Sequence, residues 1–222
     1  MKKIYYSVHD VPYTSDSYQQ SRSPVGFRFS RTEILHITIA MIVLTLAFSF
    51  ALVPGYPLRN IAMVINYIPL AFLAIATAFF CHELMHKYVG MRYGYWSEFR
   101  MFPQGLLFAF IFGLFFGIVF AAPGAVQIFG HPSKQESGKI SVAGPAINLC
   151  IAGVTFPIAF ILQGFASSML FFISYINAFL AFFNLIPFGP LDGRKIMAWR
   201  MDIWIVLLLI SLSLIVVSFV YY

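Results

Sequence analysis

The run of residues 105–122 reads GLLFAFIFGLFFGIVFAA and decides how many times the chain crosses a membrane. It is one of about six apolar segments, which lie near residues 34–53, 67–89, 105–122, 140–163, 169–190 and 203–222. A helix of about 20 apolar residues crosses roughly 30 Å of hydrocarbon. The chain is 60% hydrophobic and 10% charged, whereas an ordinary soluble domain carries about 25% charged residues. The sequence therefore predicts an all-α polytopic membrane protein.

The segment at 67–89 ends in the motif His82-Glu83-Leu84-Met85-His86. On a helix, positions i and i+4 lie roughly 40° apart, so one ion can bind both His side chains. Glu83 falls on the same side, where its carboxylate can act as a general base towards a water molecule beside the ion. The alternative is a surface helix with scattered polar residues. Ionisable groups in an apolar span are costly and usually functional, which favours a metal site.

A catalytic zinc site needs a third protein ligand and keeps a fourth position open. Asp192 is the best candidate, because the other carboxylates lie in polar connections or elsewhere at the ends of the apolar segments. Pro187 and Pro190 lack a backbone donor, so we expect the helix of the 169–190 segment to end there and Asp192 to follow in an extended turn. An ordinary turn aspartate is the alternative. We predict one Zn²⁺ per chain, bound by His82, His86 and Asp192.

The place of Asp192 depends on whether the run at 105–122 crosses the membrane. A full crossing would leave three spans between His86 and Asp192 and put them on opposite sides of the bilayer. A re-entrant segment leaves two spans, so both residues can reach one ion. Gly113 and Gly117 are suited to a turn inside the protein. We predict five full spans plus a re-entrant segment at 105–122, with an ordinary sixth span as the alternative.

The basic residues give an independent test, because Lys and Arg gather on the cytoplasmic side of membrane proteins. With a cytoplasmic N-terminus and no net crossing at 105–122, all of the 14 Lys and Arg residues except Arg59 fall on that side. Six crossings would divide them almost evenly. We therefore predict a multi-pass protein of the cell membrane, with its N-terminus and zinc site towards the cytoplasm.

The ends and the charge of the chain complete its organisation. Residues 1–30 are polar and predict a cytoplasmic N-terminal tail, and residues 31–222 predict a single transmembrane metalloprotease domain. The net charge of +6 does not indicate nucleic-acid binding, because the basic residues form no dense cluster. The sequence leaves the oligomeric state open.

These motifs resemble the site-2 protease family, the M50 type of intramembrane zinc metalloprotease. The resemblance extends from about residue 27 onward and rests on four blocks: HELMH at 82–86, NLIPFGPLDG at 184–193, Ala143-Gly144-Pro145, and Leu35-His36-Ile37-Thr38. It implies that His82, His86 and Asp192 bind zinc, that Glu83 activates water, and that Asn184 helps to hold the substrate or the developing oxyanion. The apolar insert at 105–122 departs from the family pattern, as do the single span after Asp192 and the lack of an attached PDZ or CBS domain.

We therefore expect peptide hydrolysis, with a membrane-spanning protein as substrate and the lipid bilayer as surroundings. A helical substrate hides its carbonyl groups in backbone hydrogen bonds, so it must unwind before it is cut. Pro123 and Gly124 suggest a short β-hairpin or edge strand near 120–129, to which an unwound substrate could add as a further strand.

Two other classes of protein fit part of the pattern. An inactive membrane scaffold could keep the metal for structure, although a structural zinc has no use for a general base such as Glu83. A metal or ion transporter could line its path with His82, Glu83 and Asp192.

Overall fold

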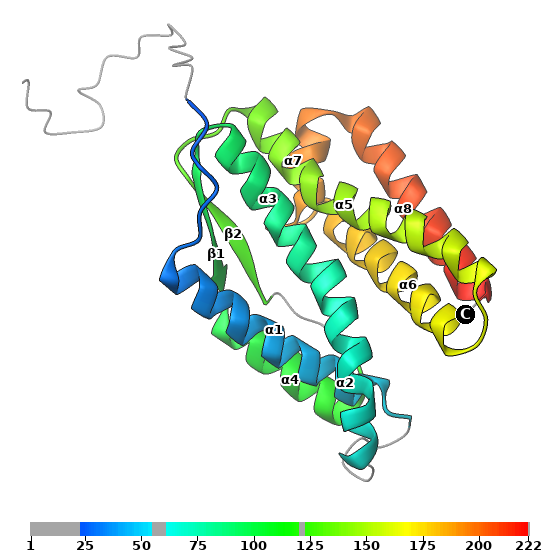
Figure 1. The fold of residues 1–222 in the computed structure, drawn as a ribbon. Coiled ribbons are helices and arrows are strands. Elements are labelled where there is room, and N and C mark those ends of the chain that lie inside the picture. Colours follow the sequence, from blue (N-terminus) through cyan, green and yellow to red (C-terminus); the bar gives the residue numbers. More distant parts are fainter. Residues whose placement is uncertain (1–22, 55–60, 120–122, 222) are drawn as a thin grey trace, which may run out of the picture.

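The computed structural model describes residues 23–54, 61–119 and 123–221, and we refer to it as the structure. Most of the predicted N-terminal tail at 1–30 lies outside the described residues. The elements follow the chain in the order α1 (Arg31–Leu52), α2 (Ile61–Ile75), η3 (Ala76–Phe80), α3 (Cys81–Arg92), β1 (Trp96–Met101), α4 (Pro103–Phe116), β2 (Gly124–Phe129), α5 (Lys134–Ile161), α6 (Phe165–Leu185), α7 (Asp192–Trp199) and α8 (Met201–Tyr221) (Figure 1).

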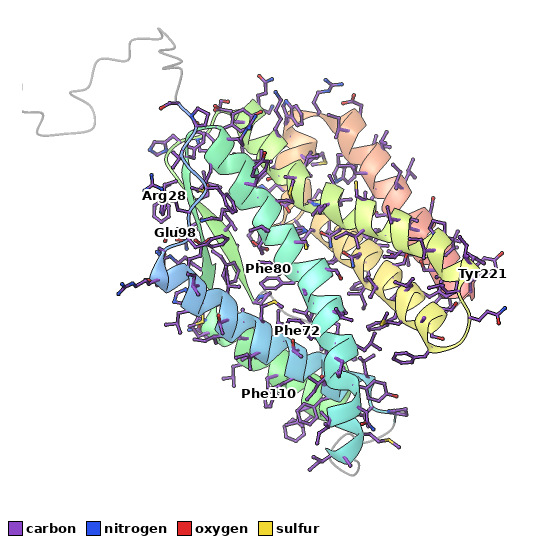
Figure 2. All side chains as sticks on the ribbon, in the orientation of Figure 1. Arg28, Phe72, Phe80, Glu98, Phe110 and Tyr221 are labelled. Carbon is purple, nitrogen blue, oxygen red and sulfur yellow. The ribbon has the colours of Figure 1, made fainter. Side chains whose placement is uncertain are left out.

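Within the described residues, five helices are long and apolar enough to cross a membrane, as the sequence predicts. They are α1, the continuous helix formed by α2, η3 and α3, and then α5, α6 and α8. In Figure 1, α3 runs between two groups of elements: α1, α4 and the strands on one side, and α5 to α8 on the other. Side chains project outward along the helices, and many of the exposed ones on α4 and α8 are large and apolar, as lipid contact requires (Figure 2).

The predicted re-entrant run forms α4, which has 14 residues and is too short to span. At 1.5 Å per residue it is about 21 Å long. It ends at Gly117, whose φ of +67° lies in the left-handed region. The strands on either side of α4 pair with each other, and Met101 lies opposite Gly124. The chain therefore returns to the point from which it left, which agrees with the prediction of no net crossing.

The predicted strand near 120–129 is β2, and residues 120–122 of that range lie outside the described residues. The sequence does not predict its partner β1, because residues 96–101 lie in a polar connection between apolar segments. The pair is not a hairpin either, since α4 intervenes between its antiparallel strands. Gly124 permits close pairing, because a Cβ there would overlap Phe99 and the backbone of Arg100 and Met101.

A buried ion pair joins α1, α3 and β1. Lys87 Nζ lies 2.7 Å from Glu33 Oε2, and both side chains are almost wholly inaccessible. The pair also occupies the outer edge of β1, because Lys87 donates to the Ser97 carbonyl and Glu33 accepts from the Phe99 amide. His36 Nδ1 accepts from the Met101 amide further along the same edge. Side chains thus cover the edge of β1 that faces away from β2.

Candidate metal centre

The two His side chains of the motif lie near the start of α3, directly after the π-helical turn η3. Their Nε2 atoms are 3.0 Å apart, and both residues are buried. Each Nδ1 atom has its own partner. That of His86 lies 2.8 Å from the Ile140 carbonyl, and that of His82 lies 2.7 Å from Asn148 Oδ1. Both rings therefore turn their Nε2 atoms to the same point.

Asp192 comes to this point from a distant part of the chain. Its Oδ2 atom lies 3.3 Å from His82 Nε2 and 3.0 Å from His86 Nε2. The expectation of an extended turn is only partly correct. Helix α6 ends at Leu185, but Asp192 is the first residue of α7 and the extended residue is Leu191. Helix α7 fits tightly, because a Cβ on Gly193 would overlap the Leu185 carbonyl.

The three side chains fit a tetrahedral metal ion. Ligand atoms about 2 Å from an ion at tetrahedral angles lie roughly 3.3 Å from one another, and the three separations are 3.0, 3.3 and 3.0 Å. Two imidazoles and one carboxylate form a donor set that zinc prefers in catalytic sites. Gly144 of α5 has no side chain, which leaves room for the two His rings. A Cβ at this position would lie 2.6 Å from His82 Nε2 and would overlap His86 Nε2.

The charge state of Asp192 suits a ligand. Burial by itself would raise the pKa of this carboxyl group, but the charge of His86 and hydrogen bonds from His82 and His86 outweigh it. The pKa of Asp192 is therefore held well below its ordinary value. A carboxylate that stays ionised can bind a cation throughout the physiological pH range.

Glu83 and Asn184, the two other predicted site residues, line the same cavity as the three candidate ligands. The cavity has a volume of about 480 Å³. Glu83 Oε2 accepts a hydrogen bond of 3.0 Å from the Val126 amide of β2. Asn184 Nδ2 donates to the Leu180 carbonyl at 3.1 Å, which leaves its Oδ1 atom and its second N–H without a partner in the described part of the chain. All five predicted residues are thus brought together.

Sequence reasoning missed three contacts of this centre. Asn148 forms a hydrogen bond with His82, and Gly144 lies so near the two rings that a Cβ there would overlap them. Neither role follows from the sequence. Val126 binds Glu83 through its backbone, which no side-chain pattern could have indicated. The sequence offered one signal for these two contacts: Gly144 and Asn148 are four residues apart and therefore lie on one face of a helix.

The apolar spans and the buried His-His-Asp cluster are those of a multi-pass membrane protein with a candidate metal centre of metalloprotease type. The model of peptidase family M50 matches residues 162–204. A protein of Methanocaldococcus jannaschii, provisionally named a zinc metalloprotease, is 42% identical over 183 residues, which cover 80% of this chain and 90% of that protein. The chain belongs to peptidase family M50, the site-2 protease family.

A second relative, from Bacillus subtilis, carries the same provisional name of zinc metalloprotease. It is 29% identical over 155 residues, which cover 60% of this chain and 69% of that protein. No solved structure matches the chain significantly.

Proposed function

We propose that this protein is an intramembrane zinc endopeptidase that hydrolyses peptide bonds of membrane-spanning proteins, with residues 31–222 as its single catalytic domain. The observation that carries the proposal is the convergence of His82, His86 and Asp192 on one point, beside Glu83 and inside a cavity. The names of the M50 relatives, both zinc metalloproteases, support zinc as the ion. We propose one ion per chain, because the three ligand atoms surround a single point.

The residues of the cavity divide the work of hydrolysis. A zinc ion bound there would polarise the carbonyl that is attacked and make water more acidic. Glu83 takes the proton from the attacking water and then transfers it to the leaving amine. Asn184, with its amide in the same cavity, hydrogen-bonds the substrate backbone or the oxyanion as charge develops.

The unwound substrate pairs with the outer edge of β2. Hydrogen bonding alternates along an antiparallel strand, so residues 124, 126 and 128 of β2 direct their backbone groups away from β1. The Val126 amide on this edge reaches Glu83, so the edge faces the catalytic groups. The corresponding edge of β1 is covered by Lys87, Glu33 and His36. Among the described residues, the outer edge of β2 is therefore the strand edge to which a substrate strand can add.

Ile128→Pro tests strand addition, because it removes an outward N–H without touching the partner of Glu83. Proline is tolerated on the free edge of a strand, so the fold should survive. We expect slower cleavage of a membrane-spanning substrate and unchanged zinc content. Cleavage at the wild-type rate would contradict pairing along this edge.

The zinc site and the N-terminus face the cytoplasm in this proposal. Five basic residues lie from the second half of α3 to the first turns of α5, namely Lys87, Arg92, Arg100, Lys134 and Lys139. Basic residues next to membrane spans stay on the cytoplasmic side. Water reaches the centre from that side through the cavity, in which Arg100 and Lys195 are among the lining residues.

Zinc content and cleavage by the Glu83→Gln variant test the function. Wild-type protein purified in detergent should contain about one zinc per chain, and His82→Ala should contain little. Glu83→Gln should keep its zinc and its fold but lose nearly all activity, because an amide cannot accept the proton of water. An ion transporter would instead move metal across vesicles and cleave nothing. An inactive scaffold would bind zinc and show no cleavage in wild-type form.

A further inference from the structure

We propose that Asn148 and Asn177 form an amide relay that fixes the coordinating nitrogen of His82. The inference rests on the proposed metal site and adds two positioning residues from α5 and α6. Neither side chain is a ligand, and both are completely buried. The relay joins three parts of the chain that are far apart in sequence: residue 148, residue 177 and the turn η3.

The orientation of the Asn148 amide follows from its partners. Asn148 Nδ2 lies 2.9 Å from the Ala78 carbonyl, which can only accept. The amide nitrogen must therefore face Ala78, and the amide oxygen faces His82. Because that oxygen can only accept, Nδ1 of His82 carries the ring proton. The lone pair of the neutral ring is then on Nε2, the atom that faces His86 and Asp192.

Asn177 holds the Asn148 amide in this orientation. Its Nδ2 atom donates to the Ile173 carbonyl at 2.9 Å and to Thr77 Oγ1 at 3.1 Å. Its Oδ1 atom then accepts the second N–H of Asn148 at 3.1 Å. A flipped Asn148 amide would aim its oxygen at the Ala78 carbonyl and at Asn177 Oδ1, and would leave these buried groups without hydrogen-bond partners.

The two candidate His ligands differ in how they are held. His86 is oriented by a backbone carbonyl, that of Ile140, which no side-chain substitution removes. His82 is oriented by a side chain, and this side chain depends on another. Both Thr77 and Ala78 belong to the π-helical turn that precedes α3, and such turns often occur at functional sites. The relay therefore holds both the ring of His82 and the turn that leads to it.

The test compares zinc affinity among α6 variants of the full-length protein, by competition with a chromophoric zinc chelator. Asn177→Ala should weaken zinc binding by about 10-fold, the lower end of the loss typical of removing a direct partner of a metal ligand, because Asn177 acts on His82 only through Asn148. Asn177→Asp keeps an acceptor for Asn148 but loses the donor to the Ile173 carbonyl, so it should recover only part of the affinity. Ser174→Ala is the matched control, because Ser174 is equally buried on α6 and donates to α5 at the Ala152 carbonyl.

Thermal unfolding of the metal-free forms separates positioning from general stability. We expect Asn177→Ala and Ser174→Ala to unfold at similar temperatures and to differ only in zinc affinity. Equal zinc affinity in all three variants and wild type would overturn the relay while leaving the metal site intact. If Asn177→Ala fails to fold, Thr77→Val removes the acceptor behind Asn177, and unchanged affinity there would overturn the relay as well. Absence of zinc from the wild-type protein would overturn both the relay and the proposed function.

Discussion

Replacing Gly144 with alanine adds one methyl group beside the Nε2 atoms of His82 and His86, the proposed metal ligands. The new Cβ would lie 2.6 Å from both Cε1 and Nε2 of His82, and closer still to Nε2 of His86. Non-bonded heavy atoms prefer separations of about 3.5–4.0 Å. The imidazoles or helix α5 must therefore move by roughly 1 Å, whereas a metal site tolerates displacements of only about 0.2 Å in its ligand distances.

The expected result is a protein that folds but binds zinc weakly. Overpacking a buried site costs about 1–3 kcal/mol, which a membrane protein of this size should withstand. Zinc affinity should fall by more than about 100-fold, beyond the usual loss from removing an outer partner of a ligand. Chelator competition measures the affinity, and unfolding in denaturing detergent measures the stability.

Gly153→Ala is the control on the same helix. A Cβ at Gly153 meets no atom within 4 Å, so this variant should keep wild-type zinc affinity. If Gly144→Ala bound zinc as tightly as Gly153→Ala, the ion would not be held by the His82 and His86 Nε2 atoms beside Gly144. The assignment of the metal position would then be wrong.

Two further predictions concern topology and stability. Single cysteines at Arg92 and Ser133, in a background without native cysteines, should both react or both fail to react with a membrane-impermeant thiol reagent added outside. A cysteine at Gln163, between α5 and α6, should show the opposite result. Different labelling at 92 and 133 would mean that α4 crosses the membrane. Lys87→Met should destabilise the protein by about 3–5 kcal/mol because it leaves the Glu33 charge buried and unpaired. Adding Glu33→Gln should restore much of that loss in denaturant unfolding, and no restoration would argue against the pair.

The sequence alone determined the features that repeat locally along the chain. Apolar run length gave the six apolar segments, because the thickness of a bilayer sets the length of a spanning helix. The distribution of Lys and Arg and the need for His86 and Asp192 to reach one ion then reduced the full spans to five. Helical periodicity gave the pairing of His82 with His86, because residues four apart share a face. The short length of helix α4 was harder to predict from the sequence, because an apolar run of similar composition can either dip into the bilayer or cross it.

Only the tertiary structure decided which distant groups meet. Strand β1 could not be recognised by itself, because its residues pair with β2 across the whole of α4. Asp192 joins the His pair through the packing of α7 against α5 and α6, and the three ligand atoms then lie at separations suited to one ion. Asn148 and Gly144 acquire their roles in the same way. A sequence records the chemistry of each side chain, but contacts between residues many positions apart are set by how the helices pack.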